Sequence, residues 1–136
     1  MSGASVILFV NMMVGGLLSA FFLVLALYDR RLVSARWFAA AYAFGVGYVI
    51  AEFILPIVHG GVTMSVLSSA SMIAALAMLN IGLAKRYEVK PPILFLGISF
   101  VTGMVLFVIS VGMERESMAR NFVYQTPFFL MQAVGA

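Results

Sequence analysis

Residues 6–28 read VILFVNMMVGGLLSAFFLVLALY, an apolar run that stops abruptly at Asp29-Arg30-Arg31. A helix needs about 20 apolar residues to cross about 30 Å of hydrocarbon, and this run is long enough. The rest of the chain has the same character: 64% of its 136 residues are hydrophobic, only 10% are charged, and the mean hydropathy is +1.13. Soluble domains carry about 25% charged residues. The sequence therefore predicts an all-α membrane protein.

Four more apolar segments follow the first. We expect membrane helices at 37–58, 62–84, 93–113 and 121–136. Gly60-Gly61 separates two of them, and Pro91-Pro92 precedes another because proline is tolerated only in the first turn of a helix. The last segment would be about 24 Å long as a helix, and no charged residue ends it. Residues 1–136 are thus expected to form one domain, a bundle of about five transmembrane helices and the front part of a larger, about seven-helix bundle.

Positive charges are distributed unevenly among the predicted loops. Loops 29–36 and 85–92 each carry three Lys or Arg residues, whereas the loop at 59–61 carries none. Cytoplasmic loops of membrane proteins are enriched in Lys and Arg. The two basic loops are therefore predicted to be cytoplasmic, with the N-terminus outside, in a multi-pass protein of the bacterial inner (plasma) membrane.

The charged residues of the chain fall in three clusters, at 29–36, 85–90 and 114–120, and Glu52 is the one charged residue outside them. A carboxylate in hydrocarbon costs a few kcal/mol, so it should face other helices or a wet cavity. Residues predicted at a comparable outer depth form with it a candidate ligand-binding pocket open to the outside: Glu52, Asn11, Gln125, Tyr48 and His59. The structural alternative is that Glu52 only bonds to Asn11 or Gln125 and fixes the helix packing.

Small residues recur four positions apart in the first, second and fourth predicted helices. This spacing lets membrane helices approach closely. The glycines predicted to mediate helix packing are Gly15, Gly16, Gly45, Gly47 and Gly103. The pattern fits packing within one bundle, and a homodimer formed through the first or second helix is the alternative.

No recognisable catalytic or metal-binding motif occurs in the sequence. The absence of Cys excludes thiolate nucleophiles, disulfides and Cys-based metal sites, and no hydrolase, metalloprotease or phosphate-loop motif is found. No cofactor is expected: haem would have only His59, and retinal needs a Lys inside a helix, whereas Lys85 and Lys90 lie in a loop. The net charge of +3 fits orientation in a lipid bilayer rather than nucleic-acid binding.

Three stretches of the sequence carry a resemblance to a known family. They are YDRRLVSARWF at 28–38, LNIGLAKRY at 79–87 and YQTPFFLMQAVGA at 124–136. They resemble the multi-helix membrane sensor region that precedes the GGDEF domain in some bacterial diguanylate cyclases. The resemblance implies that a longer parent protein makes cyclic di-GMP from two GTP molecules, through a dimeric cyclase in the cytoplasm. The catalytic sequence of that domain is absent from these residues, so this segment is not expected to be an enzyme.

The leading expectation is a membrane-embedded sensory or anchoring input module in cyclic di-GMP signalling. It would read a small-molecule ligand from the outer side and relay the signal to a cytoplasmic output domain outside this chain. One alternative is a small proton-coupled cation or multidrug exporter that uses Glu52. A second is a passive anchor that holds dimeric enzyme domains together.

Overall fold

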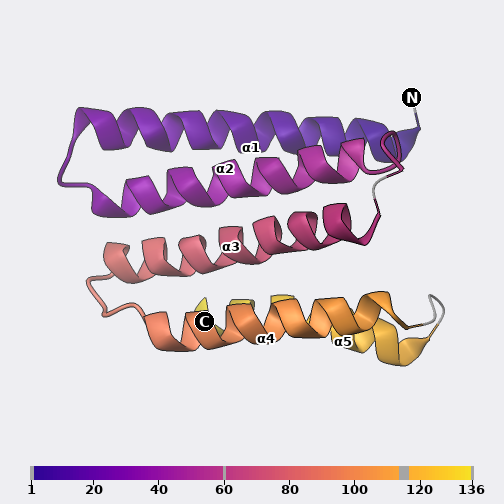
Figure 1. The fold of residues 1–136 in the computed structure, drawn as a ribbon. Coiled ribbons are helices and arrows are strands. Elements are labelled where there is room, and N and C mark those ends of the chain that lie inside the picture. Colours follow the sequence, from indigo (N-terminus) through magenta and orange to yellow (C-terminus); the bar gives the residue numbers. More distant parts are fainter. Residues whose placement is uncertain (1, 60, 114–116, 136) are drawn as a thin grey trace.

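The computed structural model describes residues 2–59, 61–113 and 117–135, and in these residues every regular element is a helix (Figure 1). The five helices are α1 (Gly3–Tyr28), α2 (Val33–Ile54), α3 (Val62–Arg86), α4 (Ile93–Val111) and α5 (Met118–Gly135). Four of them, α1 to α4, are long and apolar enough to cross a membrane. The predicted all-α architecture is therefore confirmed for the described residues, and the length and composition of these four helices support the predicted membrane character.

Three helices begin earlier than the hydropathy pattern predicts: α1, α2 and α5, which starts at Met118 and not at 121. Helix α1 starts at Gly3 because the Ser2 side chain caps it, accepting a hydrogen bond from the Ser5 amide at 3.3 Å. Helix α2 starts at Val33 and not at 37, so Arg36 lies inside its first turn. No Gly or Pro interrupts residues 33–37, and a helix can extend past the edge of the hydrocarbon.

Helix α2 ends at Ile54, four residues before the predicted limit. Pro56 has no backbone N–H to donate to the carbonyl of Glu52, so the α-helical hydrogen-bond pattern stops there. The chain continues through a short turn in which the Ile57 and Val58 amides both donate to the Ile54 carbonyl.

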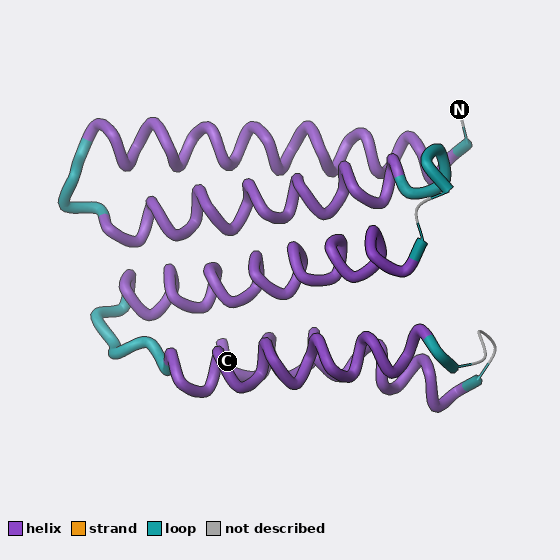
Figure 2. The backbone as a smooth tube through the Cα atoms, viewed as in Figure 1, coloured by secondary structure: helices purple, strands orange, loops and turns teal. Residues whose placement is uncertain are grey.

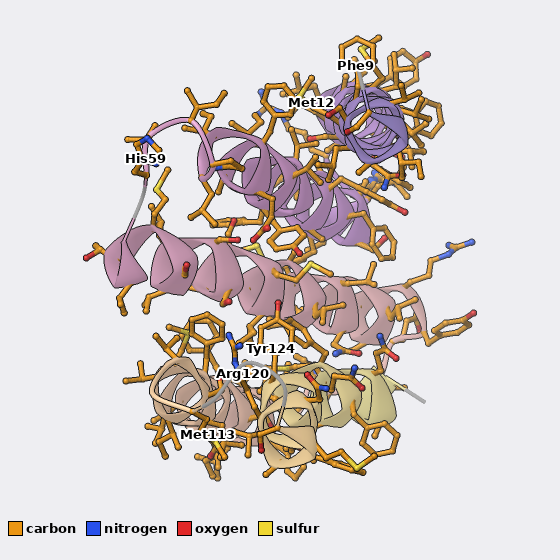
Figure 3. The ribbon with its side chains drawn as sticks, turned by 90° about the vertical axis from the view of Figure 1, so that its right-hand side faces the viewer. Phe9, Met12, His59, Met113, Arg120 and Tyr124 are labelled. Carbon is orange, nitrogen blue, oxygen red and sulfur yellow. The ribbon has the colours of Figure 1, made fainter. Side chains whose placement is uncertain are left out.

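Helices α1, α2, α3 and α4 lie side by side in this order, and α5 lies behind α4 (Figure 1). Among the described residues, α1 packs against α2 alone, α2 packs against α1 and α3, and α3 also packs against both α4 and α5. Viewed down the helices, α1 and α2 lie on one side of α3, and α4 and α5 lie on the other (Figure 3). Helix α3 is thus the central helix: it joins the α1–α2 pair to the α4–α5 pair, and α3, α4 and α5 pack together as a group of three.

Successive helices are antiparallel, so the connections gather at two ends of the molecule (Figure 2). The connections after α1 and α3 lie together at one end, and the N-terminus lies at the other with the α2–α3 connection (Figure 1). The two connections at the first end are those in the basic loops at 29–36 and 85–92. The structure therefore places the basic loops at one end of the molecule, as the predicted alternation requires.

The tightest packing occurs around α3. Ile73, Leu96 and Met131 form a buried cluster that joins α3, α4 and α5. Next to it, the buried Asn80 side chain donates a hydrogen bond to the Met131 carbonyl at 2.7 Å. Large apolar side chains elsewhere point outward, particularly along α1 and α4. Such an apolar exterior is the surface that lipid tails solvate.

Candidate outer pocket

Glu52 projects from the last turn of α2 toward α3. Its carboxylate atom Oε1 accepts a hydrogen bond from Ser68 Oγ at 2.6 Å. Ser68 is buried in α3, whereas Glu52 is half-buried. The bond fixes one carboxylate oxygen at the interface between α2 and α3 and holds the acid off the lipid surface, as an intramembrane carboxylate requires.

Arg120 and Tyr124 come from α5 on the other side of α3. They are four residues apart and therefore share one face of the helix. Figure 3 shows both side chains extending from α5 toward α3. The Tyr124 ring packs against Phe107 and Phe128, with ring centroids 5.8 and 5.6 Å away. These aromatic contacts give Tyr124 a defined position beside the guanidinium group.

A cavity of about 480 Å³ opens between these two groups of residues. Its lining comes from four helices, at their ends opposite the basic loops, and from the connections between them: Glu52, Leu55, Gly61, Val62, Ser65, Ser69, Phe107, Val111, Met113, Arg120 and Tyr124. An acid on α2 and a base on α5 thus line the same space. Among the described residues, no ion pair within 4.0 Å joins Glu52 to Arg120.

The structure brings together only part of the predicted pocket. Glu52 lines the cavity, whereas Tyr48, one turn earlier on α2, is half-buried and is not among the lining residues. Asn11, Gln125 and His59 are exposed and are absent from the lining.

The absence of each of these three residues from the cavity lining has a geometric reason. Asn11 is on α1, which packs against α2 alone and never reaches α5. Gln125 follows Tyr124 directly and is therefore rotated by about 100° around the helix from it. His59 lies on the connection after α2, away from Arg120 and Tyr124 (Figure 3).

Sequence reasoning missed Arg120, Ser65 and Ser69 as cavity residues. The predicted helix at 121–136 leaves Arg120 in the preceding loop, but α5 begins at Met118 and includes it. The sequence could have indicated Arg120, because it lies four residues before Tyr124 and a helix would place both on one face. The two serines recur four residues apart on α3, one helical turn from each other.

The predicted packing glycines differ in their surroundings. A Cβ atom added at Gly15 would lie 2.9 Å from Val46, at Gly47 3.3 Å from Ser71 Oγ, and at Gly103 2.9 Å from Pro127. Added at Gly16 or Gly45, it would meet nothing within 4 Å.

The fold and the cavity define a class: a helical protein with four apolar helices of membrane-spanning length, and with an acid and a base in one cavity at the helix ends opposite the basic loops. Within residues 2–59, 61–113 and 117–135, no three His, Cys, Asp or Glu side chains come together. Comparison with protein-family models, with curated proteins and with solved structures finds no match for the chain.

Proposed function

We propose that this chain is a membrane-embedded sensory input module. Its outer cavity would bind a small ligand, and α5 would pass the change on to a cytoplasmic output domain. The observation that supports this proposal is that one cavity is lined by Glu52 from α2 and by Arg120 and Tyr124 from α5. A ligand that contacts both sides would change the relative stability of alternative positions of α5.

A ligand shifts a conformational equilibrium only through a difference in its affinity for the two states. Helix α5 offers a route for such a shift. Its outer part faces the cavity, and farther along it the Met131 carbonyl is bonded to Asn80 of α3. The far end of α5 points toward the end of the molecule that holds the basic loops (Figure 1). With those loops on the cytoplasmic side of the inner membrane, a displacement of α5 would reach the cytoplasm.

The resemblance to sensor regions of diguanylate cyclases suggests cyclic di-GMP as the output. The first experiment is therefore to extend the reading frame past Ala136 and to measure cyclic di-GMP with and without the membrane region. A GGDEF domain whose output depends on this region is the expected result. A stop codon soon after Ala136 would overturn this form of the proposal.

The cavity is tested by comparing Glu52→Gln with Asn11→Ala in the same output assay. Glu52 lines the cavity, whereas Asn11 is exposed on α1. Glu52→Gln is expected to change the output, and Asn11→Ala is expected to leave it unchanged.

The same two variants separate the alternatives. Substrate efflux by this chain alone that is lost in Glu52→Gln would favour the exporter. An output that is unaffected by Glu52→Gln but abolished by substitutions on a dimer face would favour the passive anchor.

A further inference from the structure

We propose that the outer cavity binds a small zwitterion, with its ammonium group at Glu52 and its carboxylate or phosphate group at Arg120. The inference rests on the proposed function only in taking this cavity as the ligand site. It adds the chemical class of the ligand, which neither the sequence nor the resemblance indicates.

The opposite charges of Glu52 and Arg120 favour a ligand that carries both a positive and a negative group. Glu52 and Arg120 line one cavity from different helices without an ion pair between them within 4.0 Å. Charged groups within a membrane protein are costly unless they pair with each other, with water or with a ligand. A cation alone would satisfy Glu52 and an anion alone would satisfy Arg120. A ligand that carries both charges satisfies both groups at once.

The geometry of each charged group supports its assigned role. Ser68 donates to Oε1 of Glu52, which leaves the second carboxylate oxygen to accept from an ammonium group. The Arg120 guanidinium has the planar donor arrangement that matches carboxylates and phosphates. Tyr124 lines the same cavity and adds a hydroxyl that can donate or accept a hydrogen bond.

The size and the remaining lining define the rest of the ligand. A volume of about 480 Å³ lies within the range of small-molecule pockets. Ser65 and Ser69 add polar groups to the wall, and apolar side chains form another part of it: Leu55, Val62, Phe107, Val111 and Met113. The ligand should therefore carry an apolar part beside its two charges. An apolar amino acid from outside and the headgroup of phosphatidylethanolamine share this chemistry.

The test uses the full chain in nanodiscs of phosphatidylglycerol, a lipid without an ammonium group, and tritiated L-leucine as the probe. Competitors are 4-methylpentanoate, which lacks the ammonium group, and 3-methylbutylamine, which lacks the carboxylate. Saturable leucine binding at millimolar concentration or below is expected, with each analogue at least about tenfold weaker, the equivalent of one lost charge contact. The lipid arm replaces leucine with phosphatidylethanolamine and measures its retention by native mass spectrometry after detergent exchange.

Variants assign the binding to this cavity. Glu52→Gln and Arg120→Gln are each expected to weaken binding of leucine, or retention of the lipid, by at least about tenfold. Arg120→Lys keeps the charge and should retain part of the binding. Asn11→Ala should bind as the unmodified chain does. Circular dichroism of each variant shows whether a loss of binding is a loss of fold.

Binding of leucine alone identifies a solute from outside, and retention of phosphatidylethanolamine alone identifies a lipid headgroup. Failure of both probes overturns the proposal. Equal competition by the singly charged analogues also overturns it, as does unchanged binding in folded Glu52→Gln and Arg120→Gln. If the probes fail while cyclic di-GMP output still depends on Glu52, this inference is wrong and the proposed function stands. If a probe binds as expected but cyclic di-GMP output does not depend on Glu52, this inference stands and the proposed function is wrong.

Discussion

At the residue scale, Glu88 has an unusual backbone conformation with φ of 57°. It follows the last residues of α3, where the Val89 amide donates to the Ala84 carbonyl and the Glu88 amide donates to the Lys85 carbonyl. This pair of hydrogen bonds is the Schellman motif, which ends a helix with one residue in the left-handed region. Glycine is the usual residue at that position because a side chain there is strained.

Replacing Glu88 with glycine should stabilise the protein. Glycine adopts the left-handed conformation without the cost of a Cβ atom, so we expect Glu88→Gly to raise the free energy of unfolding by about 0.5 to 1 kcal/mol. Thermal unfolding in detergent, followed by circular dichroism, measures the change. Glu88→Ala is the matched control because it removes the same carboxylate and keeps the Cβ atom. A similar gain in both variants would mean that charge, and not backbone strain, is responsible.

Asn80 provides a buried polar contact between helices. Its side-chain amide donates to the Met131 carbonyl of α5 at 2.7 Å. Hydrogen bonds between membrane helices contribute about 0.6 kcal/mol on average and up to about 1.7 kcal/mol. We expect Asn80→Ala to destabilise the protein by about 1 kcal/mol, measured by the same unfolding assay. Asn121→Ala, at an exposed position of α5, should have no measurable effect, and equal losses in the two variants would contradict the prediction.

At the element scale, Gly82 sets the distance between α3 and α2. A Cβ atom added there would lie 2.8 Å from Phe38 Cε1 and 3.2 Å from Trp37 Cβ. Both neighbours are in the early turns of α2, so the helices could accommodate an extra methyl group only by separating or by moving the aromatic ring.

Gly82→Ala should therefore destabilise the fold, by about 1 to 3 kcal/mol, as overpacking does in other cores. Gly97→Ala on α4 is the control, because an added Cβ atom there meets nothing within 4 Å. Alanine favours helix over glycine by about 1 kcal/mol, so the control should be neutral or slightly stabilising. A gain in stability in Gly82→Ala would show that Phe38 moves aside at no cost.

At the scale of the whole molecule, the proposed orientation in the membrane rests on the two basic loops at one end. The chain has no native Cys, so single cysteines report on accessibility without background. We expect an impermeant maleimide to label Val58→Cys in intact cells and Lys90→Cys only after permeabilisation. Both residues are exposed and lie in connections at opposite ends (Figure 2). The reverse pattern would invert the proposed orientation.

Helix α5 needs its own measurement because it is not among the four helices that are long and apolar enough to cross. Green fluorescent protein fused after Ala136 should be fluorescent, and alkaline phosphatase at the same position should be inactive. This outcome would place the far end of α5 in the cytoplasm. An active phosphatase would mean that α5 does not cross.

Much of the helical pattern could be predicted from local sequence. The apolar runs and the charges that follow them indicated α1 to α4, with errors confined to their ends. Those errors arose where hydrogen bonding and not hydropathy decides the limit: the Ser2 cap extended α1, and Pro56 shortened α2. The candidate pocket was predicted less completely, since Glu52 lines the cavity whereas Asn11 and Gln125 do not.

The sequence by itself determined that this protein is built from apolar helices, because the cost of exposing backbone polar groups to hydrocarbon acts on each segment separately. It also identified Glu52 as a candidate pocket residue, because a lone carboxylate in an apolar helix can be recognised without a structure. Only the tertiary structure decided which residues share a cavity with Glu52. Depth along a helix can be counted from the sequence, but the rotation of each helix and its choice of neighbours depend on packing between side chains that lie far apart in the chain. That packing placed Arg120 of α5 opposite Glu52 and left Asn11 of α1 outside.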